Sequence, residues 1–463
     1  MNSNTASFDA PTVRSEDLLV VAERLVGQAR PGEQLEVACS EGTSTSVRVY
    51  GGEVESFTSA RSQGIGVRVI VEGREGFASA GSLDDDIVAN ALAEARDNAG
   101  FSEADEFAGV ADDDGVVAVD VDLWDRAVLD MATEAKIAMA IELERAVTSA
   151  DARISGVRTA TYGDSAASFV LASTSGIRAA SRATSASIGV QALADDTDGR
   201  TQTGSAFDAA RSPHSLDLPS VAHRAVSEAV DLLGATKPSS GSVALVLDPR
   251  LAATVFGLIS GTLTGDRILK KRSPFVGRLR ESIASDLLTI FDDPTDPESL
   301  GADSHDGEGL ACRSNRLITG GKLDGFLYDA YNGRKSGVGS TGSAVRGTRG
   351  LPGPGVQALH VAPGSGGSID DLISSVDHGV LVFSLAGLHS GVNPVSGDFS
   401  VGVEGRMIRN GALAEPIAEC TLGSTLQRLL LGVTEVGSDV DHLPSGVSTP
   451  GVVISDVMLS GSS

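Results

Sequence analysis

The chain has 463 residues, a length that predicts about three domains and leaves room for a large buried core. Its 62 acidic residues outnumber its 36 Lys and Arg residues, so the formal net charge is −26. Direct binding of nucleic acid is not expected, because neutralising phosphates requires a stripe of basic side chains.

The first block of the chain predicts an α+β unit with an antiparallel sheet. Residues 15–29 carry apolar side chains at helical spacing, and Ser15 is a candidate N-cap. Val47 and Val49 alternate with polar neighbours, as in a half-buried strand. The glycines at 51–52 then predict a turn into a second strand.

A second helix in this block carries signals at both of its ends. Ser82 and Asp85 have the spacing of a capping box, and Gly100 lies where the helix is expected to stop. Residues 101–120 are acidic and irregular, which predicts a linker. We therefore expect a first α+β domain at residues 1–120.

Residues 121–237 predict a central domain. It begins with a long helix over 128–151 and continues with short strands in the Ser-, Thr-, Ala- and Gly-rich stretch 154–207. A helical pattern returns over 218–235. The Pro-, Ser- and Gly-containing segment 236–241 then marks the end of the domain.

Residues 238–463 predict a Gly-rich, mostly β, barrel-like domain. Gly320-Gly321 and Asn410-Gly411 each predict a tight hairpin turn, and Asn-Gly is a strong signal for a type I′ turn. Many short strands with this much glycine are typical of a barrel-like or layered β domain. The expected fold class is α+β, with an N-terminal antiparallel sheet and helices before this C-terminal domain.

The cysteines and the N-terminus bear on the compartment. Cys39, Cys312 and Cys420 lie far apart, so neither a disulfide framework nor a cysteine zinc site is predicted. The first 13 residues have no basic start and no apolar core, so no signal peptide is expected. The uncharged stretch from residue 251 is too short and polar to span a bilayer. We expect a cytoplasmic protein without membrane contact.

Common catalytic motifs give little support to an enzyme site. The segment "GVGSTG" at 337–342 fits G-x-G-x-x-G, but it follows a polar turn and no helical run succeeds it, which indicates a loop against another backbone. Neither G-x-S-x-G nor a P-loop motif occurs. None of the seven histidines forms H-x-x-x-H or H-E-x-x-H, the spacing that places two imidazoles on one ion.

Four residues are candidates for a substrate cleft. His389 lies among small residues in "GLHSGVNPVSGDFS", together with Asn393 and Asp398. Asp398 is expected at the start of a hairpin strand, and an alternative is that it only caps the turn before that strand. Glu308 in "DGEG" is the fourth candidate, with a solvated turn as its alternative.

The helix expected over "LAATVFGLIS", residues 251–260, has no side chain that could bind a metal ion or act as a general base. It follows a hydrophobic strand, a common place for catalytic ligands, yet none of its residues carries a charge, an imidazole or a thiol. Leu251, Val255 and Leu258 have helical spacing. We therefore expect this helix to pack in the core.

Three long segments carry a resemblance to a known family. They are "GGEVESFTSARSQGIGVRVIVEGREGFASA" from residue 51, the stretch 304–344 and the stretch 391–430. With them, the chain resembles the TldD/PmbA family from about residue 45 onward. It is most similar to the PmbA branch, also called TldE and historically described as a modulator of DNA gyrase.

The resemblance implies that this chain has no zinc site and no catalytic residues of its own. In the TldD branch, the matching helix carries H-E-x-x-x-H, whose histidines hold zinc with a C-terminal cysteine while the glutamate is the general base. Here the helix at 251–260 has none of these side chains, and residues 445–461 contain no cysteine. Cys420 falls at a position that the family does not use for metal.

By the same resemblance, the chain is a non-catalytic subunit of a heteromeric metalloprotease that degrades or processes unfolded peptides. A TldD-like subunit would supply the zinc, and this chain would form part of the substrate chamber. Two alternatives stay open. One is a self-sufficient metallopeptidase with an unusual site around His378, His389 and Asp398, and the other is a peptide-binding module without a protease partner.

Overall fold

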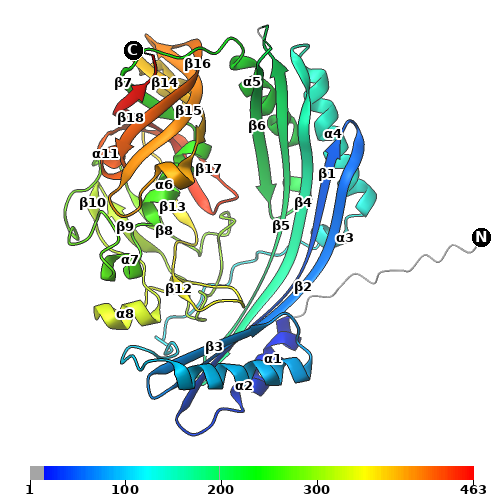
Figure 1. The fold of residues 1–463 in the computed structure, drawn as a ribbon, viewed down its shortest axis with the longest axis vertical. Coiled ribbons are helices and arrows are strands. Elements are labelled where there is room, and N and C mark those ends of the chain that lie inside the picture. The colour runs from blue at the N-terminus through cyan, green and yellow to red at the C-terminus, as the bar shows by residue number, and fades with distance from the viewer. Residues whose placement is uncertain (1–14, 198, 463) are drawn as a thin grey trace, which may run out of the picture.

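Two β-sheets organise the chain, and the fold is α+β (Figure 1). The computed structural model describes residues 15–197 and 199–462. The expectation that no signal peptide is present falls on residues 1–13, which lie outside the described residues. Within the described residues, no helix is both long enough and apolar enough to cross a membrane.

The N-terminal sheet has six antiparallel strands in the order β3-β2-β1-β4-β5-β6. Long, curved strands dominate it in Figure 1. The strands are β1 (Glu33–Tyr50), β2 (Glu53–Val71), β3 (Arg74–Ala80), β4 (Ile154–Ser173), β5 (Arg178–Asp195) and β6 (Thr201–Ala210).

The turn expected at residues 51–52 joins β1 to β2. Gly51 and Gly52 both have positive φ, 62° and 79°, which glycine adopts without steric cost. Their backbone N–H groups donate to the Glu144 carboxylate at 2.7 and 2.6 Å. A helix side chain therefore fixes the end of this hairpin.

Helices cover one face of the N-terminal sheet. Val37 and Cys39 of β1 pack in a core with α1 and α2, and Val47 and Val49 further along β1 pack in a second core with α4 and α5. Because alternate residues of a strand share a face, these four side chains lie on the same side of the sheet. The helices are α1 (Ser15–Val26), α2 (Asp85–Phe101), α3 (Ala127–Asp130), α4 (Thr133–Ala150) and α5 (Leu218–Asp231), with a short 3₁₀ turn at Pro213–Ser215.

The expected capping box of α2 is wrong. The helix begins at Asp85 with Asp84 as N-cap, and no side chain bonds the cap. The Ser82 hydroxyl instead accepts from the Asp84 backbone N–H at 3.1 Å, because Ser82 stands two positions before the N-cap. Gly100 lies inside the helix, which ends one residue later.

The long helix expected over 128–151 is divided. Met131, in extended conformation, follows the single turn α3, and Ala132 then serves as N-cap of α4. Buried Lys136 of α4 donates to the Val128 carbonyl oxygen at 3.2 Å, so the two pieces remain in contact. The helical pattern of the sequence continues through residues 131–132, where the extended backbone interrupts the helix.

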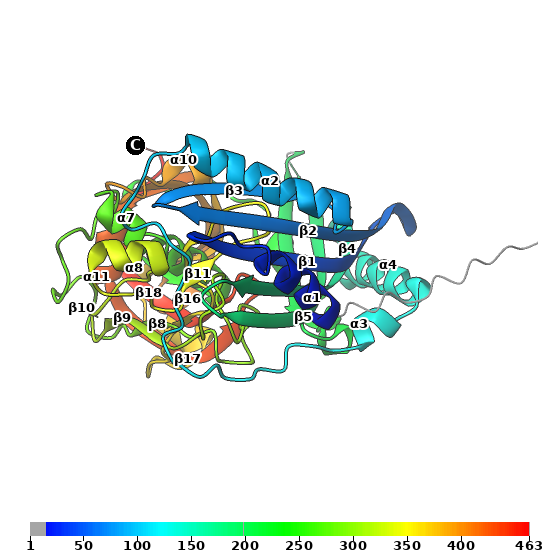
Figure 2. The same ribbon diagram turned by 90° about the horizontal axis from the view of Figure 1, so that it is seen from below.

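Strand pairing crosses the boundary expected at residue 120. β1 pairs with β4 from Glu36↔Ser173 to Val49↔Ala160, so segments from both expected domains share one sheet. The acidic segment 103–126 is irregular, as expected for a linker, and in Figure 2 it runs as a cyan thread along the C-terminal part. Arg334 holds it there by donating to the carbonyl oxygens of Phe107 and Gly109.

The C-terminal sheet has ten strands, and part of it closes into a ring. Its order is β10-β9-β8-β13-β18-β16-β15-β14-β7, with β17 beside β18 and a further pairing between β18 and β7. The path β18-β16-β15-β14-β7 therefore returns to β18, so these five strands form a closed ring. This ring is the part of the domain that corresponds to the expected barrel-like fold. The strands are β7 (Gly241–Leu247), β8 (Ile290–Asp292), β9 (Asn315–Thr319), β10 (Lys322–Leu323), β13 (Leu359–Val361), β14 (His378–Ala386), β15 (Asp398–Arg409), β16 (Ala412–Thr425), β17 (Val433–His442) and β18 (Val447–Ser460).

Both hairpin turns expected in this region are present. Asn410, φ 49°, and Gly411, φ 76°, join β15 to β16, and Gly320-Gly321 joins β9 to β10. The remaining elements are a two-stranded sheet of β11 (Ala344–Val345) and β12 (Gly353–Pro354), and the helices α6 (Pro249–Ser260), α7 (Gly265–Leu269), α8 (Ala330–Ser336), α9 (Ile369–Ser374), α10 (Leu388–Gly391) and α11 (Leu426–Leu431).

The G-x-G-x-x-G segment is a loop against another backbone, as its sequence context indicated. It follows α8, whose C-cap Gly337 has φ 73°. A Cβ at Gly333 would lie 2.2 Å from the Gly339 carbonyl oxygen, so the loop folds back onto α8 at a distance that only glycine permits.

The C-terminal part packs against the face of the N-terminal sheet that the helices leave free. Ala38 and Leu171 of this face share a small apolar cluster with Leu310 and Ala330. A Cβ at Gly66 would lie 2.6 Å from the Thr348 carbonyl oxygen, which shows how closely the two parts approach. All three cysteines are free and buried.

Candidate functional site

The helix at the centre of the C-terminal core, α6, is built by local sequence signals. Strand β7 leads directly into it, and the Asp248 carboxylate accepts from the Leu251 backbone N–H at 2.9 Å. Pro249 occupies the first turn, where its missing N–H costs no hydrogen bond. The helix begins where a capping aspartate and proline predict it.

The buried face of α6 is apolar except for Ser260 at its end, whose hydroxyl donates to the Gly257 carbonyl oxygen. Leu251, Val255, Phe256 and Ile259 are buried in the large C-terminal core. Leu258, expected to share this face, is only half-buried, because Ile259 takes the inward position. No residue of α6 offers an imidazole, thiolate or carboxylate to a metal.

Three of the cleft candidates come together in one exposed loop between β14 and β15. His389 lies in α10, Asn393 follows it, and β15 begins at Asp398. All three side chains are exposed. Their arrangement leaves them accessible to a ligand, and their role stays a prediction.

The side chains of Asn393 and Asp398 form different hydrogen bonds in this loop. The Asn393 Oδ1 atom accepts from the backbone N–H of Val395 at 2.9 Å and of Ser396 at 3.3 Å, which shapes the turn. The Asp398 carboxylate accepts from the Ser396 hydroxyl at 2.6 Å and, within the described part of the chain, from no backbone N–H. Asn393, rather than Asp398, therefore caps the turn.

A site that unites His378 with His389 is wrong on geometry. The two residues lie at opposite ends of β14: His378 is its first residue, and His389 follows its last residue. A nine-residue strand spans about 26 Å at 3.3 Å per residue, too far for one metal ion. Within the described residues, no group of three or more His, Cys, Asp or Glu side chains is placed to hold a metal.

Glu308 lies away from the loop, in the contact between the C-terminal part and the N-terminal sheet. Its side chain is fully buried, and its Oε2 atom accepts from the Ala330 backbone N–H at 2.7 Å. Arg68 Nη1 of β2 is 3.7 Å from its other oxygen. Burial and the nearby acids Glu36 and Asp306 raise the pKa of Glu308. Because the Glu308 side chain is 0% exposed, the alternative of a solvated turn is wrong.

Glu308 belongs to a cluster of buried charges that we call the interdomain charge seam, made of Glu36, Arg68, Glu308 and Arg346. Arg346 bonds Glu36, and Arg68 lies 3.7 Å from Glu36 while bonding the more exposed Glu75. No local pattern predicts this seam, because its four members come from four separate segments that only the tertiary fold joins.

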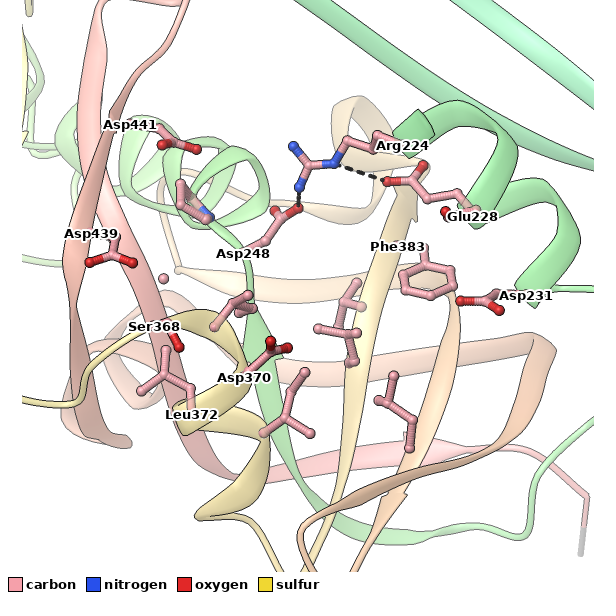
Figure 3. A pocket seen from close by; sticks show the side chains of 18 of the residues that line it. Arg224, Glu228, Asp231, Asp248, Ser368, Asp370, Leu372, Phe383, Asp439 and Asp441 are labelled. Carbon is pink, nitrogen blue, oxygen red and sulfur yellow. Dashed lines mark hydrogen bonds and ion pairs between the residues drawn. The ribbon is translucent and has the colours of Figure 1, made fainter. Parts of the chain in front are cut away.

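A pocket of about 490 Å³ lies between α5 and the C-terminal part (Figure 3). On one side, Arg224 contacts both Asp248 and Glu228. On the other side stand Asp370 and Asp441, for which the described residues provide no ion pair or hydrogen bond to the carboxylate. Burial, with Asp248 nearby, raises the pKa of Asp441. The pocket therefore favours a cationic over an anionic ligand.

Sequence reasoning missed this pocket. Its walls come from α5, the start of α6, α9, β14 and β17, which are separated by long stretches of chain. No spacing rule connects a residue of α5 with one of β17, so only the assembled fold brings these acids together.

Three family models match the chain in order. They are the PmbA/TldA metallopeptidase domain 1 over residues 35–99, the central domain over 126–233 and the C-terminal domain over 240–461. Together they account for both sheets and for most of the helices.

Similar proteins and structures span nearly the whole chain. Metalloprotease PmbA of Escherichia coli O157:H7 is 26% identical, with 92% of each chain covered. A PmbA homologue of Haemophilus influenzae is 25% identical, with 99% of each covered. The fold is similar to a putative modulator of a DNA gyrase from Thermotoga maritima, with TM-score 0.88, 23% identity, 96% of this chain and 100% of that one covered. It is also similar to TldE from Thermococcus kodakarensis, with TM-score 0.86, 22% identity and coverages of 96% and 99%.

Proposed function

Because the chain belongs to the PmbA/TldA metallopeptidase family, we propose that it is the non-catalytic, TldE-like subunit of a two-component metalloprotease acting on unfolded peptides. Relatives named metalloprotease PmbA match it over almost its full length. A solved TldE has the same fold. In this proposal a related TldD-like subunit supplies the zinc, in the cytoplasm.

The composition of α6 carries the proposal. A zinc hydrolase needs about three protein ligands, an open coordination position and a base. The donor set of this chain does not fit, because α6 presents Val255, Phe256 and Ile259 to the core, and β18 behind it contains no cysteine. A catalytic ion would have to be held by another chain.

The free part of the N-terminal sheet supports a role in lining a substrate chamber. On the face opposite α4 and α5, Ser44 and Ser46 of β1 and Ser187 of β5 are exposed. Small hydroxyl side chains offer hydrogen bonds without bulk or charge. Such a surface suits extended peptides of varied sequence, since it selects against no particular side chain.

The test is reconstitution with a TldD-like protein from the same cell. We expect native mass spectrometry to detect a complex, and peptide cleavage to require both chains and to stop when zinc is chelated. The isolated chain, after dialysis, should contain well under one zinc by elemental analysis. Stoichiometric zinc with chelator-sensitive cleavage by this chain alone would refute the non-catalytic role.

A peptide-binding module without a protease partner is the second candidate. The acid-lined pocket beside α5 favours it, because the pocket exists within this single chain. Peptide binding by the isolated chain, with no complex formed and no cleavage stimulated in any TldD-like protein, would select this candidate instead.

A further inference from the structure

Residues 267–280, "RILKKRSPFVGRLR", form a strongly basic stretch in an acidic chain. They contain six Lys and Arg residues and no acidic residue, although the formal net charge of the chain is −26. The stretch begins in α7 and continues as a loop toward β10, and both elements lie on the outer, left side of the C-terminal part in Figures 1 and 2. A local excess of positive charge is therefore concentrated on one surface.

Ion pairs leave part of this charge uncompensated. Lys270, Arg278 and Arg280 each have one acidic partner. Lys271 and Arg272 are exposed, and in the part of the chain that the structure describes neither side chain has an ion pair or a hydrogen bond. Because acidic residues outnumber basic ones in this chain, two neighbouring unpaired cations are not expected from composition alone.

Strand β10 adds another unpaired cation. The Arg280 backbone N–H donates to the Leu323 carbonyl oxygen at 2.9 Å, and Ser282 forms an antiparallel bridge with Lys322, so the loop ends beside this strand. Lys322 is exposed, and among the described residues its side chain has no ion pair. We call this surface the basic patch, made of Lys271, Arg272, Arg278, Arg280 and Lys322.

The backbone of the loop does not explain these cations. Lys271 and Arg280 have positive φ, 54° and 71°, in the left-handed region that glycine and asparagine adopt at lower cost. Phe275 between them is buried in the large C-terminal core, which anchors the loop. Local folding alone would favour glycine or asparagine at both positions, so their charged side chains point to binding.

Aliphatic side chains are exposed among the cations. Val276 and Leu279 are 38% and 47% exposed. We propose that the basic patch binds an acidic segment of another polypeptide, in which carboxylates flank an apolar side chain. The carboxylates pair with the Lys and Arg side chains, and the apolar side chain covers Leu279. This inference goes beyond the proposed function, because such binding requires neither zinc nor a second subunit.

Other anionic partners fit the basic patch less well. Single-stranded nucleic acid binds with its bases stacked on aromatic side chains, and Phe275, the one aromatic residue of the stretch, is 0% exposed. An anionic membrane would approach the exposed acids Glu281 and Asp286 beside the patch, which repel it. A short peptide can contact the cations without covering these acids.

The first test measures binding of acidic probe peptides to the full chain by fluorescence anisotropy. A short labelled peptide with leucine between glutamates should bind, with an affinity that falls as salt screens the charges. The double variant Lys271→Glu with Arg272→Glu should raise the dissociation constant at least about tenfold. Arg158→Glu with Lys237→Glu is the matched control, because it changes the net charge equally at exposed cations elsewhere, and it should have little effect.

The second test separates the apolar contribution and the kind of partner. Leu279→Ser should weaken binding of the leucine probe about threefold and leave binding of a probe with serine in place of leucine unchanged. Lys271→Gln with Arg272→Gln, which introduces no negative charge, should also weaken binding. Single-stranded DNA and phosphatidylserine vesicles should bind more weakly than the leucine probe. Absence of probe binding at low salt, an equal loss in the matched control, or tighter binding of DNA or vesicles would each overturn the proposal.

Discussion

Asp292 shows how one buried carboxylate couples stability to pH. Its Oδ1 atom accepts from the Gln357 and Ala358 backbone N–H groups at 3.0 and 2.7 Å, while Oδ2 is buried with no hydrogen-bond partner in the described structure. Burial, the largest cause, raises the pKa of Asp292 from 3.8 to about 7. The folded protein therefore favours the protonated acid.

The pH dependence of Asp292 follows from this shift. A raised folded-state pKa gives stability that is present below the unfolded pKa and is lost as the pH rises through the folded pKa. We expect wild type to lose stability relative to Asp292→Asn by about 1.4 kcal/mol per pH unit between pH 4 and pH 7. Urea unfolding of both proteins across this range measures the difference. An unchanged difference between them would contradict the assignment, and Asp112→Asn, at an exposed acid, is the control.

Substitutions at Asn393 and Asp398 test two different properties of the loop between β14 and β15. Asn393 determines its backbone conformation, and Asp398 contributes a negative charge. Asn393→Ala removes the acceptor of two backbone N–H groups and should loosen the loop, with a loss of about 1 kcal/mol or less in overall stability because the loop is exposed. Asp398→Asn keeps the acceptor for Ser396 but removes the charge. We expect it to lower cleavage by the assembled complex more than it lowers the melting temperature. Equal losses in both measurements would assign Asp398 a structural role only.

At the scale of the element, α6 is a packing helix. Val255 and Ile259 are 2% and 1% exposed and lie one turn apart on the buried face. Replacing both with His should destabilise the chain by roughly 1–3 kcal/mol for each buried polar group left unpaired, because neither a third ligand nor orienting partners are present. Thermal unfolding and elemental analysis for zinc test this expectation.

Leu258→His provides the matched control on the same helix. Leu258 is half-buried, so an imidazole there can reach water and should cost much less. If the double variant were as stable as wild type and bound one zinc, the rest of a metal site would have to exist in this chain, and the non-catalytic reading would be wrong.

Local signals in the sequence were sufficient for most elements but not for their ends. The turns at 51–52 and at 410–411 were predicted because glycine and Asn-Gly determine the backbone there. The start of α2 was missed, because the capping motif at Ser82 competes with an extended backbone at Asp84. Propensity fixes the kind of element, whereas the exact boundary depends on neighbours that the local sequence does not contain.

For the whole molecule, the interdomain charge seam links the two sheets. Arg68 is 2% exposed and stands between the buried acids Glu36 and Glu308. We expect Arg68→Met to cost about 3–5 kcal/mol at neutral pH, because it leaves the buried Glu308 carboxylate without its arginine, whereas Glu36 keeps its ion pair with Arg346. Exposed Arg126→Met, which breaks a surface pair with Asp130, should cost less than about 1 kcal/mol.

The deficit of Arg68→Met should grow with pH. Burial already raises the pKa of Glu308, and removing Arg68 raises it further, so the variant holds a protonated acid that is stable at low pH. As the pH rises through that pKa, the charged form must be accommodated and stability falls. Urea unfolding at pH 5 and pH 8 compares the two deficits. Equal values would show that packing of the side chain, rather than its charge, matters.

The seam also marks the limit of sequence analysis at this scale. Glu308 was selected as a candidate because of its context in a glycine-rich turn, but nothing near it indicated Arg68, which lies 240 positions earlier. The pairing of β1 with β4 across the expected boundary at residue 120 has the same origin. Contacts between distant segments depend on the three-dimensional fold, so a single sequence does not identify them.

The closed path of strands in the C-terminal sheet sets the order in which the protein can mature on the ribosome. The N-terminal sheet is complete at β6 and covered by α5 at residue 231, so it can form while the remainder is still being synthesised. The ring closes only with β18, which pairs with β7, β13, β16 and β17. Until β18 emerges, these strands expose unpaired edges to other nascent chains. We therefore expect this half of the molecule to need the greatest protection by chaperones during synthesis.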